Sequence, residues 1–488
     1  MLAQDGVDDN CTDATLAAAC ATENRLCVTT DPDGGIEESC GPCIEGFVEF
    51  PVKTNTSSTT NDERESTCIN IDTELTLDDF LEYFQPLFRD DEDDNREAVR
   101  LRRVAALMEA ARSIQQHNVK ARNGTFSFSL GLNKFATDSD EEVTQRLGLL
   151  PLPEGVSMKD PLKEEDVLED DVDTWESRLP FPPSSINWVE KRAVTFVKDQ
   201  GRCGCCWSVA AAGAIEGLVA IQSNFTYLQS VSFQQFISCS DQQIPVPTPD
   251  GTYIFQNQGC NGGWPAIAMV YSNLNLFGGM ATLNNYSFTD GKGDTTEECK
   301  LENQDLAMNT SGIRILMDGS PATTFEKRVQ LMKKAVSQQP ISIVMNAECK
   351  TLSRYKGGVL NDGCTCNPPA DCPLNHAVLL VGYNDNSDPP YWLIKNSWGS
   401  DWGENGYFRV SQANSNGGSP FSWGYFGILN TGVFPVNAQN LTVEVVDKPQ
   451  SSDDGLKWWH IFLIVLAGAG FGIGCAMAVR VMRGDAPY

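Results

Sequence analysis

Three side chains far apart in the sequence have the types and settings that thiol chemistry needs. Cys206 precedes an alanine-rich run over 209–218 that predicts a helix, and a cysteine at a helix N-terminus has a lowered thiol pKa because the helix dipole favours the thiolate. His376 is the only histidine between 183 and 436. Asn396 follows a strand-like run, where its amide can hold an imidazole while Trp398 excludes water. The pattern predicts a Cys–His nucleophilic couple, although a buried cysteine or a lone histidine is more often structural.

Several short motifs around these residues stand in an order and separation that resemble the papain family (cathepsin L-like) of cysteine proteases. The resemblance covers about 183–436 and is carried by Ile186-Asn-Trp188, the run Ala193 to Gly201, Cys206-Trp207, Gly259-Cys-Asn-Gly-Gly-Trp-Pro265, Asn375-His376-Ala377 and Lys395-Asn-Ser-Trp-Gly399. It implies an α+β fold with two lobes, a helical left lobe and a β-barrel-like right lobe.

The resemblance also implies a role for each matching residue. Cys206 would be the nucleophile, His376 the general base and then acid, and Asn396 the residue that orients the imidazole. Gln200 and the Cys206 N–H would form the oxyanion hole, although Gln200 also suits an ordinary turn. The expected substrate-binding residues are Gly262, Gly263, Trp264, Pro265, Thr431 and Trp398, the last of which is equally credible as packing. The expected substrate is a peptide or protein, hydrolysed through a thioester without a cofactor or a metal.

The cysteines of this region follow the family only in part. The resemblance pairs Cys203 with Cys260 and Cys239 with Cys299, whereas Phe426 stands where a third bridge needs a cysteine. We predict two local disulfides within a separate group, with a zinc site of four cysteine ligands as the alternative; this group is Cys349, Cys364, Cys366 and Cys372. Cys205 replaces a small polar residue without a sequence rationale, and a Cys205–Cys206 redox switch is one hypothesis. We also expect an added surface loop between Cys239 and Cys260, and we find no histidine-containing insertion over 263–284, which favours an endopeptidase.

Residues 71–150 are helical in character. Alanine, leucine, arginine and glutamate dominate 98–118, and apolar residues recur along one face of the predicted helix, namely Leu101, Val104, Ala105, Met108, Ala111 and Ile114. The segment resembles the inhibitory propeptide of the same family, which would make it an intramolecular inhibitor. It departs from the family pattern at Val99, Ala110 and Thr137, the last where an aspartate is usual. The alternative is a plain helical spacer.

The chain is strongly acidic, and its acidity is uneven. Its 488 residues hold 65 Asp and Glu against 36 Lys and Arg, a net charge of −29, which argues against a nucleic-acid binder. Residues 1–182 carry a net charge of −24 and residues 183–488 only −5. The acidic stretch 151–182 reads as an exposed linker that holds the maturation site. We hypothesise that carboxylates at 90–94 and 164–176 lose charge as pH falls and loosen the propeptide from the cleft.

Cysteine usage points to an oxidising compartment. Six of the 17 cysteines fall within residues 1–70, which predicts a small disulfide module, loosely EGF-like, that could bind a protein partner. Seven Asn-x-Ser/Thr sequons agree with this compartment, at Asn10, Asn55, Asn123, Asn224, Asn285, Asn309 and Asn440. The first residues lack a signal peptide, and we expect that it was removed or lies outside this sequence.

An apolar run near the C-terminus predicts a membrane anchor. Residues 458–479 are almost unbroken in apolar character and are followed by Arg480 and Arg483, as in a bilayer span with a cytosolic tail. The expected organisation is a stalk over 437–456, a transmembrane helix over 457–479 and a tail over 480–488. A buried core helix is the alternative. The peptidase domain would then be lumenal or extracellular, in a lysosome, endosome or vacuole or at the cell surface.

Two functions of different classes fit these observations. The first is a membrane-anchored cysteine endopeptidase made as a zymogen. The second is a catalytically silent or still-inhibited papain-fold protein that serves as a structural or adhesion partner through its Cys-rich head. The presence of Cys206, His376, Asn396 and Gln200 together favours the enzyme.

Overall fold

The computed structural model describes most of the chain between residues 96 and 440, together with four short strands before it. The described residues are 25–30, 37–43, 48–51, 66–69, 96–152, 156–157, 160, 172–248, 251–274, 279–293, 296–300, 306–317, 323–362, 373–414 and 422–440. The chain divides into units 1–441 and 442–488, and every described residue belongs to the first unit.

The N-terminal strands form two antiparallel pairs. β1 (Arg25–Thr30) pairs with β2 (Glu37–Cys43), and β3 (Val48–Pro51) pairs with β4 (Ser66–Ile69). The side chains of these strands are not described, so the disulfide connectivity predicted for residues 1–70 lies outside the described part of the structure.

The predicted upstream helix is part of α3 (Arg96–Arg122), which is followed by β5 (Phe128–Leu130) and α4 (Asp140–Thr144). The buried face of α3 consists of Val104, Leu107, Ala110, Ala111 and Ile114. Ala105, which we expected on this face, is exposed, because at 100° per residue it lies opposite Leu107. α4 begins with a capping box in which Ser139 and Glu142 satisfy each other's backbone N–H groups.

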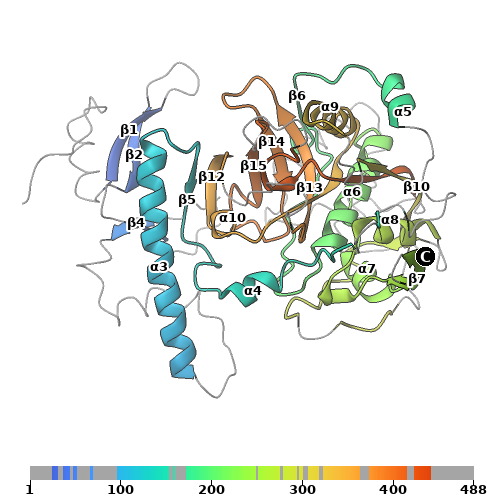
Figure 1. Cartoon of the computed structure of the whole chain (residues 1–488), viewed down its shortest axis with the longest axis horizontal. Helices are drawn as coiled ribbons and strands as arrows, with labels where there is room; N and C mark the ends of the chain where they lie inside the picture. Colours follow the sequence, from blue (N-terminus) through green and yellow to red (C-terminus); the bar gives the residue numbers. More distant parts are fainter. Residues whose placement is uncertain are drawn as a thin grey trace, which may run out of the picture. The chain divides into compact units, whose positions relative to one another are not determined.

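Helices of the region after residue 200 gather on one side of residues 183–436, the expected peptidase region (Figure 1). They are α6 (Cys206–Gln222), α7 (Phe233–Cys239) and α8 (Pro265–Leu274). α6 is buried along nearly its whole length because small residues let its neighbours approach closely. A Cβ at Gly213 would lie 2.8 Å from Leu379, and one at Gly217 would lie 2.6 Å from Pro340. α9 (Phe325–Val336) and α10 (Lys350–Ser353) follow later in the chain.

A single mixed sheet runs through the rest of this region and into the expected propeptide, residues 71–150, which we call the prosegment. Its strand order is β5-β12-β15-β14-β13-β11-β16-β10-β9, with β6 pairing off this path with β13. The strands are β6 (Ser185–Asn187), β9 (Met280–Ala281), β10 (Leu306–Leu316), β11 (Ile341–Met345), β12 (Tyr355–Leu360), β13 (His376–Asn384), β14 (Tyr391–Lys395), β15 (Tyr407–Ser411) and β16 (Gly432–Asn440). Because β5 belongs to the prosegment and pairs antiparallel with β12, the upstream region covers one edge of this sheet.

The loop expected between Cys239 and Cys260 contains a hairpin of β7 (Ile244–Thr248) and β8 (Gly251–Phe255). This hairpin forms a two-stranded sheet of its own. Three-residue helical turns lie at Gly259–Asn261 and Tyr425–Gly427.

Two segments that we expected to be linkers are structured in part. The stretch 151–182 contains α5 (Val172–Arg178), whose Trp175 packs against the core. β16 continues to Asn440 by pairing with β10 beyond residue 436, where the stalk was expected to begin. In both places long-range contacts stabilise a segment whose own composition is polar.

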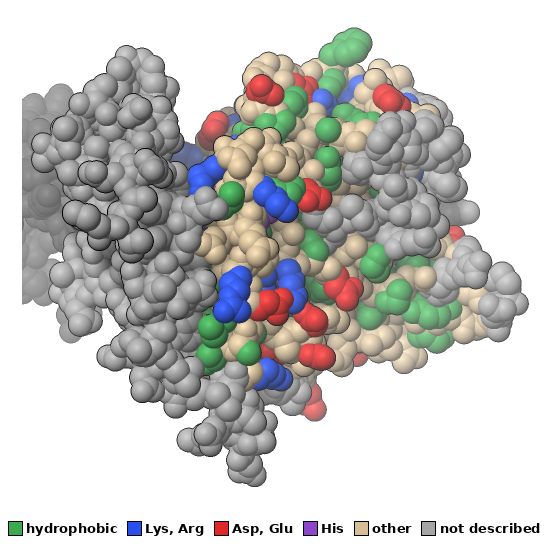
Figure 2. All heavy atoms as spheres, turned by 60° about the vertical axis from the view of Figure 1, so that its left-hand side comes forward, with side chains coloured by type: hydrophobic (Ala, Val, Ile, Leu, Met, Phe, Trp, Pro, Cys, Tyr) green, Lys and Arg blue, Asp and Glu red, His purple; other side chains and the backbone are tan. Residues whose placement is uncertain are grey.

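The face of the molecule in Figure 2 carries Lys and Arg side chains interspersed with Asp and Glu. Of the acidic runs at 90–94 and 164–176, residues 90–94 and 164–171 lie outside the described residues. In the part of the chain that the structure describes, no helix has the length and apolar character to span a bilayer. The predicted span over 457–479 falls outside that part.

Candidate active site

Cys206 is the first residue of α6, and its side chain is fully buried. It packs with Ala210 of the same helix and Ala377 of β13. The backbone N–H groups of Ala377 and Gly148 both interact with its thiol. The sulfur thus lies where α6 meets β13, in contact with the residue that follows His376.

The imidazole of His376 is fixed by Asn396. Its Nε2 lies 2.9 Å from Asn396 Oδ1, and the same oxygen accepts a hydrogen bond from the Ser397 N–H at 2.9 Å, which sets the orientation of the amide. The Trp398 indole lies 5.0 Å from the imidazole and is almost fully buried. Nδ1 of His376 is buried without a partner among the described residues. It is therefore the ring nitrogen left to exchange a proton with a neighbouring thiol.

Gln200 is completely buried and makes hydrogen bonds through both ends of its amide. Its Nε2 donates to the Cys203 carbonyl at 2.7 Å and to the Arg146 carbonyl at 2.9 Å. Its Oε1 accepts a hydrogen bond from the Ser397 hydroxyl. Ser397 therefore connects the two amides of the site, since its backbone N–H holds Asn396 and its side chain holds Gln200.

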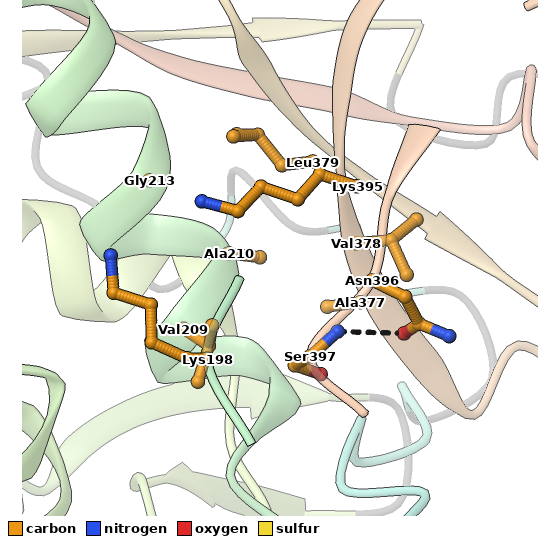
Figure 3. Close-up of a pocket in the computed structure, with 10 residues that line it drawn as sticks. All are labelled: Lys198, Val209, Ala210, Gly213, Ala377, Val378, Leu379, Lys395, Asn396 and Ser397. Atoms are coloured by element: carbon orange, nitrogen blue, oxygen red, sulfur yellow. Dashed lines mark hydrogen bonds between the residues drawn. The ribbon is translucent and has the colours of Figure 1, made fainter. Parts of the chain in front are cut away.

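A buried charged cluster lies behind this site. Lys198 Nζ is 2.8 Å from Glu216 Oε1 of α6, and Lys395 Nζ at the end of β14 donates to the Thr195 carbonyl at 2.8 Å. Both lysines project toward α6 beside a small cavity in Figure 3. Burial lowers the pKa of Lys395, and so does the charge of Lys198. Burial opposes ionisation of Glu216, but the two lysines dominate and its pKa is lowered. The cluster ties the segment before Gln200 to both α6 and β14.

The prosegment lies directly over Cys206, the predicted nucleophile. The Arg146 carbonyl accepts from Gln200, the Gly148 N–H interacts with the Cys206 thiol, and the Gly148 carbonyl accepts from Gly263 N at 2.9 Å. Leu149 N donates to the Asn375 carbonyl at 3.1 Å. Gly148 is required here because a Cβ would lie 1.7 Å from the Gly204 carbonyl oxygen. Prosegment backbone thus occupies the hydrogen-bonding groups that a bound peptide would need.

Burial under the prosegment holds the reactive pair neutral. It raises the pKa of the Cys206 thiol to about 11, although backbone N–H groups oppose the shift, and it lowers the pKa of His376 to about 4, although Asn396 opposes that one. Between these values the thiol and the imidazole are both uncharged. The covered site therefore lacks the thiolate that nucleophilic attack requires.

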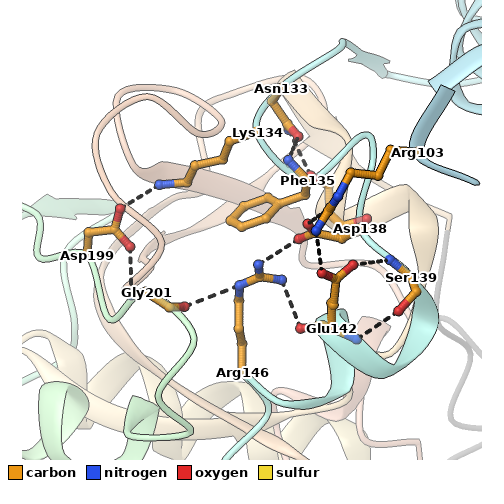
Figure 4. Close-up of polar contacts among 11 residues, drawn as sticks. Arg103, Asn133, Lys134, Phe135, Asp138, Ser139, Glu142, Arg146, Asp199 and Gly201 are labelled. Carbon is orange, nitrogen blue, oxygen red and sulfur yellow. Dashed lines mark hydrogen bonds and ion pairs between the residues drawn. The ribbon is translucent and has the colours of Figure 1, made fainter. Parts of the chain in front are cut away.

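A buried ionic network anchors the prosegment (Figure 4). Arg103 of α3 pairs with Glu142 at 2.8 Å, and Arg146 pairs with Asp138 at 2.6 Å. Arg146 Nε also donates to the Gly201 carbonyl at 3.2 Å. The carboxylate that the sequence lacks at Thr137 is thus supplied by the next residue, Asp138.

Two further contacts join the prosegment to the peptidase region. Lys134 pairs with Asp199 at 2.6 Å, and the Phe135 ring packs edge-on against Trp398 at 5.4 Å. Trp398 also covers His376, so the prosegment contacts the residue that shields the predicted Cys206–His376 pair from water.

The predicted substrate-binding residues divide into two groups. Gly262 and Gly263 lie against the prosegment, Trp264 is fully buried and donates from Nε1 to the Leu150 carbonyl at 3.0 Å, and Pro265 begins α8. Thr431 is buried, and its hydroxyl donates to Asn430 at 2.6 Å. Gly262, Gly263 and Trp264 therefore contact the prosegment, whereas the described contact of Thr431 is with its chain neighbour.

Two disulfides of the peptidase region are present, Cys203–Cys260 and Cys239–Cys299. Cys349 is disulfide-bonded, which opposes the alternative of a zinc site with four cysteine ligands, and Cys364, Cys366 and Cys372 lie outside the described residues. In the described residues no cluster suits a metal ion. Cys205 and Cys206 are unbridged. Cys205 lies in the main core, where burial raises its thiol pKa, whereas the Cys206 side chain lies in the small cluster with Ala210 and Ala377.

The sequons differ in exposure. Asn123, Asn224 and Asn285 are exposed. Asn309 is only half-exposed within β10, with its Oδ1 buried, so it is a poorer glycosylation site than the exposed asparagines. Asn10 and Asn55 lie outside the described residues, and the side chain of Asn440 is not described.

Sequence reasoning missed the prosegment residues that contact the site, Arg146 and Gly148, and the bridging residue Ser397. The signal available in the sequence was a glycine flanked by apolar residues after the capping box of α4. Its contact with Gly204 depends on the tertiary fold and has no sequence signature.

Comparisons with known proteins agree with this geometry. Residues 182–422 match the family model described as papain family cysteine protease. The chain is 33% identical over 232 residues to a KDEL-tailed cysteine endopeptidase of Arabidopsis thaliana, covering 47% of this chain and 54% of that relative. It is 30% identical over 313 residues to cathepsin L2 of Homo sapiens, covering 62% of this chain and 79% of that relative.

Solved structures extend the likeness into the prosegment. A digestive procathepsin L 3 of Tenebrio molitor superposes with a TM-score of 0.53 at 26% identity, covering 74% of this chain and 98% of that chain. A recombinant stem bromelain precursor superposes with a TM-score of 0.53 at 26% identity, covering 73% of this chain and 97% of that chain. The papain-like α+β fold expected from the sequence is confirmed by these likenesses.

Proposed function

Because the chain belongs to the papain family of cysteine proteases and is a cysteine-type peptidase, we propose that it is an endopeptidase made as a zymogen. The observation that carries this proposal is the path of the prosegment. The Arg146 carbonyl accepts a hydrogen bond from the Gln200 amide, and the Gly148 N–H interacts with the Cys206 thiol. A peptide bound at the same groups would place a carbonyl carbon next to the sulfur.

The chemistry follows from the positions of four side chains. In the uncovered site His376 Nδ1 takes the thiol proton, and the Cys206 thiolate attacks the carbonyl carbon of a peptide bond. The oxyanion that forms accepts hydrogen bonds from Gln200 Nε2 and the Cys206 N–H. The imidazolium then gives its proton to the amine as the carbon–nitrogen bond breaks, leaving a thioester on Cys206. Water, deprotonated by His376, hydrolyses the thioester and returns the thiol.

We propose further that the enzyme is membrane-anchored and that its catalytic domain is lumenal or extracellular. The support is the apolar run over 458–479, the arginines after it, the 17 cysteines and the exposed sequons. The Arabidopsis relative is described as an endopeptidase, which supports internal cleavage. The silent-partner alternative is not favoured, because Asn396 holds His376, Cys206 packs against the neighbouring residue Ala377, and Gln200 is bound to Ser397 beside Asn396.

A thiol trap tests the proposal directly. The full chain is incubated with a peptidyl epoxide at about pH 5, where acid favours opening of the covered cleft, and the labelled residue is located by mass spectrometry. We expect one adduct at Cys206 and, in the same sample, cleavage of a protein substrate. The Cys206→Ser variant is the control and should show neither. Absence of labelling at Cys206 after removal of the prosegment would refute the peptidase mechanism.

A further inference from the structure

A polar cavity of about 400 Å³ opens beside the nucleophile, between the prosegment and the peptidase region. The prosegment side includes Gln145 and Gly148. On the peptidase side it is lined by Arg202, Gly204, Cys260, Asn261, Lys292 and Gly293. When the prosegment leaves, this peptidase side remains as an open pocket of the cleft.

The walls of this pocket come from three segments that are tied together. The Cys203–Cys260 disulfide and the bond from Gly204 N to the Cys260 carbonyl, at 2.9 Å, join the first two. Arg202 N donates to the Gly291 carbonyl at 2.8 Å and so joins the third. A Cβ at Gly293 would lie 2.8 Å from the Arg202 carbonyl. Much of the pocket wall is therefore closely packed backbone. Because few side chains of the protein fill the pocket, it has space for a side chain of a bound substrate.

The position of the pocket identifies the substrate residue that can enter it. Gly204 stands two residues before Cys206, and Gly148, which lines the same pocket, contacts the Cys206 thiol through its N–H. When a substrate carbonyl oxygen points at Gln200, the carbonyl carbon lies next to the Cys206 sulfur. The side chain of the same substrate residue branches from its Cα, which is one bond away from that carbonyl carbon. Gly204 lacks a side chain that would obstruct this direction. The pocket is therefore within reach of the side chain on the residue whose carbonyl is attacked.

The charges that face this space are positive. Arg202 and Lys292 are the ionisable side chains among its lining residues, and no Asp or Glu lines it in the described part of the chain. Arg202 has an interaction elsewhere, so the argument depends first on Lys292, which is exposed. Asp294, the acid nearest to Lys292 in the sequence, lies outside the described residues, whereas Asp290 accepts from Gln234 at 2.6 Å and Glu297 pairs with Lys300 at 2.8 Å.

We propose that this basic pocket of Arg202 and Lys292 selects a glutamate or aspartate side chain on the residue whose carbonyl Cys206 attacks. The inference rests on the proposed function and names its substrate class. Charged groups placed along a cleft of one sign favour ligands of the opposite sign. The chain carries suitable residues in its own linker, where six of the eight residues 164–171 are acidic.

Three peptides that differ only at this residue, Glu, Gln or Lys, test the proposal with the acid-activated enzyme. Glu and Gln have nearly the same shape, so the ratio of their kcat/KM values isolates the charge. At about pH 6, where a glutamate side chain is ionised, we expect Glu to exceed Gln about tenfold and Lys to be the poorest. The ratio should fall as salt is added, because screening weakens an exposed charge interaction.

Two variants assign the effect to the pocket. Lys292→Gln should lower the Glu-to-Gln ratio at least threefold, and Lys292→Gln combined with Arg202→Gln should bring it close to about one. Lys300→Gln is the matched control, because Lys300 is an exposed lysine nearby that pairs with Glu297 and does not line the pocket. It should leave the ratio at the wild-type value.

The outcomes separate this inference from the function on which it rests. Equal rates for the Glu and Gln peptides, or a preference for Glu that survives in the double variant, would overturn the inference and leave the peptidase intact. Failure of the activated chain to cleave any of the three peptides or a denatured protein would overturn both.

Discussion

At the scale of single residues, Ser397 holds the two amides of the site in register. Its hydroxyl donates to Gln200 Oε1, so the Gln200 NH2 faces the position that the Arg146 carbonyl now occupies. Without this bond the amide can rotate and present its oxygen to the developing oxyanion, which would repel it.

We therefore predict that Ser397→Ala lowers kcat of the activated enzyme about tenfold, with KM changed less than about twofold, since the lost interaction acts in the transition state. Steady-state kinetics measure the effect. Ser342→Ala is the control, because the buried Ser342 hydroxyl has no partner in the described part of the chain. Equal kcat values for the two variants would contradict the role given to Ser397.

The buried carboxylate of Glu216 supports two lysines, Lys198 and Lys395. Glu216→Gln leaves these lysines in the interior without a counter-charge, and we predict a loss of about 3–5 kcal/mol in the free energy of unfolding. Urea denaturation of the Cys206→Ser background, which cannot digest itself, measures this loss. Glu297→Gln removes an exposed carboxylate and should leave stability nearly unchanged. A similar midpoint for both variants would show that the cluster is not a stabilising centre.

The residues that we propose to do chemistry stand in recognisable sequence motifs, whereas the residues that restrain them do not. Cys206, His376, Asn396 and Gln200 stand in dense local motifs, so their identities could be predicted. Asp138 replaces the expected carboxylate one residue late, and only its 2.6 Å pair with Arg146 reveals the equivalence. Such a compensation depends on where the backbone places the side chain and has no signature in residue spacing.

At the scale of elements, α5 fastens the end of the linker to the peptidase region. Its Trp175 ring lies 6.0 Å from Phe434 of β16 and 5.0 Å from the Arg314 guanidinium of β10. Glu176 pairs with Lys327 and with Lys334 of α9, the latter at 3.2 Å. Burial alone would raise the pKa of Glu176, but the two lysines outweigh it and lower that pKa.

Glu176→Gln should therefore loosen α5, and we predict about tenfold faster opening of its amides in hydrogen exchange at neutral pH. The sign with pH follows from the lowered pKa. The docked helix has its full stability above the ordinary glutamate pKa and loses it as pH falls through the lowered value. Ser177→Ala, at an exposed position of the same helix, should exchange as wild type. Faster exchange in both variants would mean that helix propensity rather than the ion pairs holds α5.

The local sequence pattern predicted some helices and strands but gave no sign of others. The helix over 98–118 follows from composition, although the expected face included Ala105, which is exposed. β5 is only three residues long and owes its existence to pairing with β12. α5 lies in an acidic stretch, and its partners Lys327, Lys334 and Phe434 are more than 140 residues away. Short elements made by long-range contacts could not be predicted from sequence alone.

At the scale of the whole molecule, the prosegment closes the cleft and also changes its protonation. In the closed state burial lowers the pKa of His376 from its ordinary 6.5 to about 4. When the cleft opens, the imidazole regains water, so it binds a proton at higher pH while the Cys206 thiol keeps its own proton. Between these values the open state binds more protons, and acidification therefore favours opening. The difference is worth up to about 3 kcal/mol.

The pH response of the zymogen therefore depends on a base, His376, as well as on carboxylates. Glu142 and Glu176 both have a lowered pKa in the docked state, so their ion pairs break only below the ordinary glutamate range. The acidic runs at 90–94 and 164–176 were predicted to lose charge as pH falls, and residues 90–94 and 164–171 of these runs lie outside the described residues. His376 would act at higher pH, between about pH 4 and 6.5.

We predict that the Cys206→Ser chain, which cannot process itself, opens between about pH 4 and 6.5, and that adding His376→Gln shifts the midpoint at least one pH unit lower. Glutamine can still hydrogen-bond to Asn396 but takes up no proton. Acrylamide quenching of tryptophan fluorescence measures opening, since Trp264 and Trp398 are buried beneath the prosegment. Carboxylates acting alone would give both chains the same midpoint, below about pH 4.5. A midpoint that stays the same on adding His376→Gln would therefore remove the histidine from the mechanism.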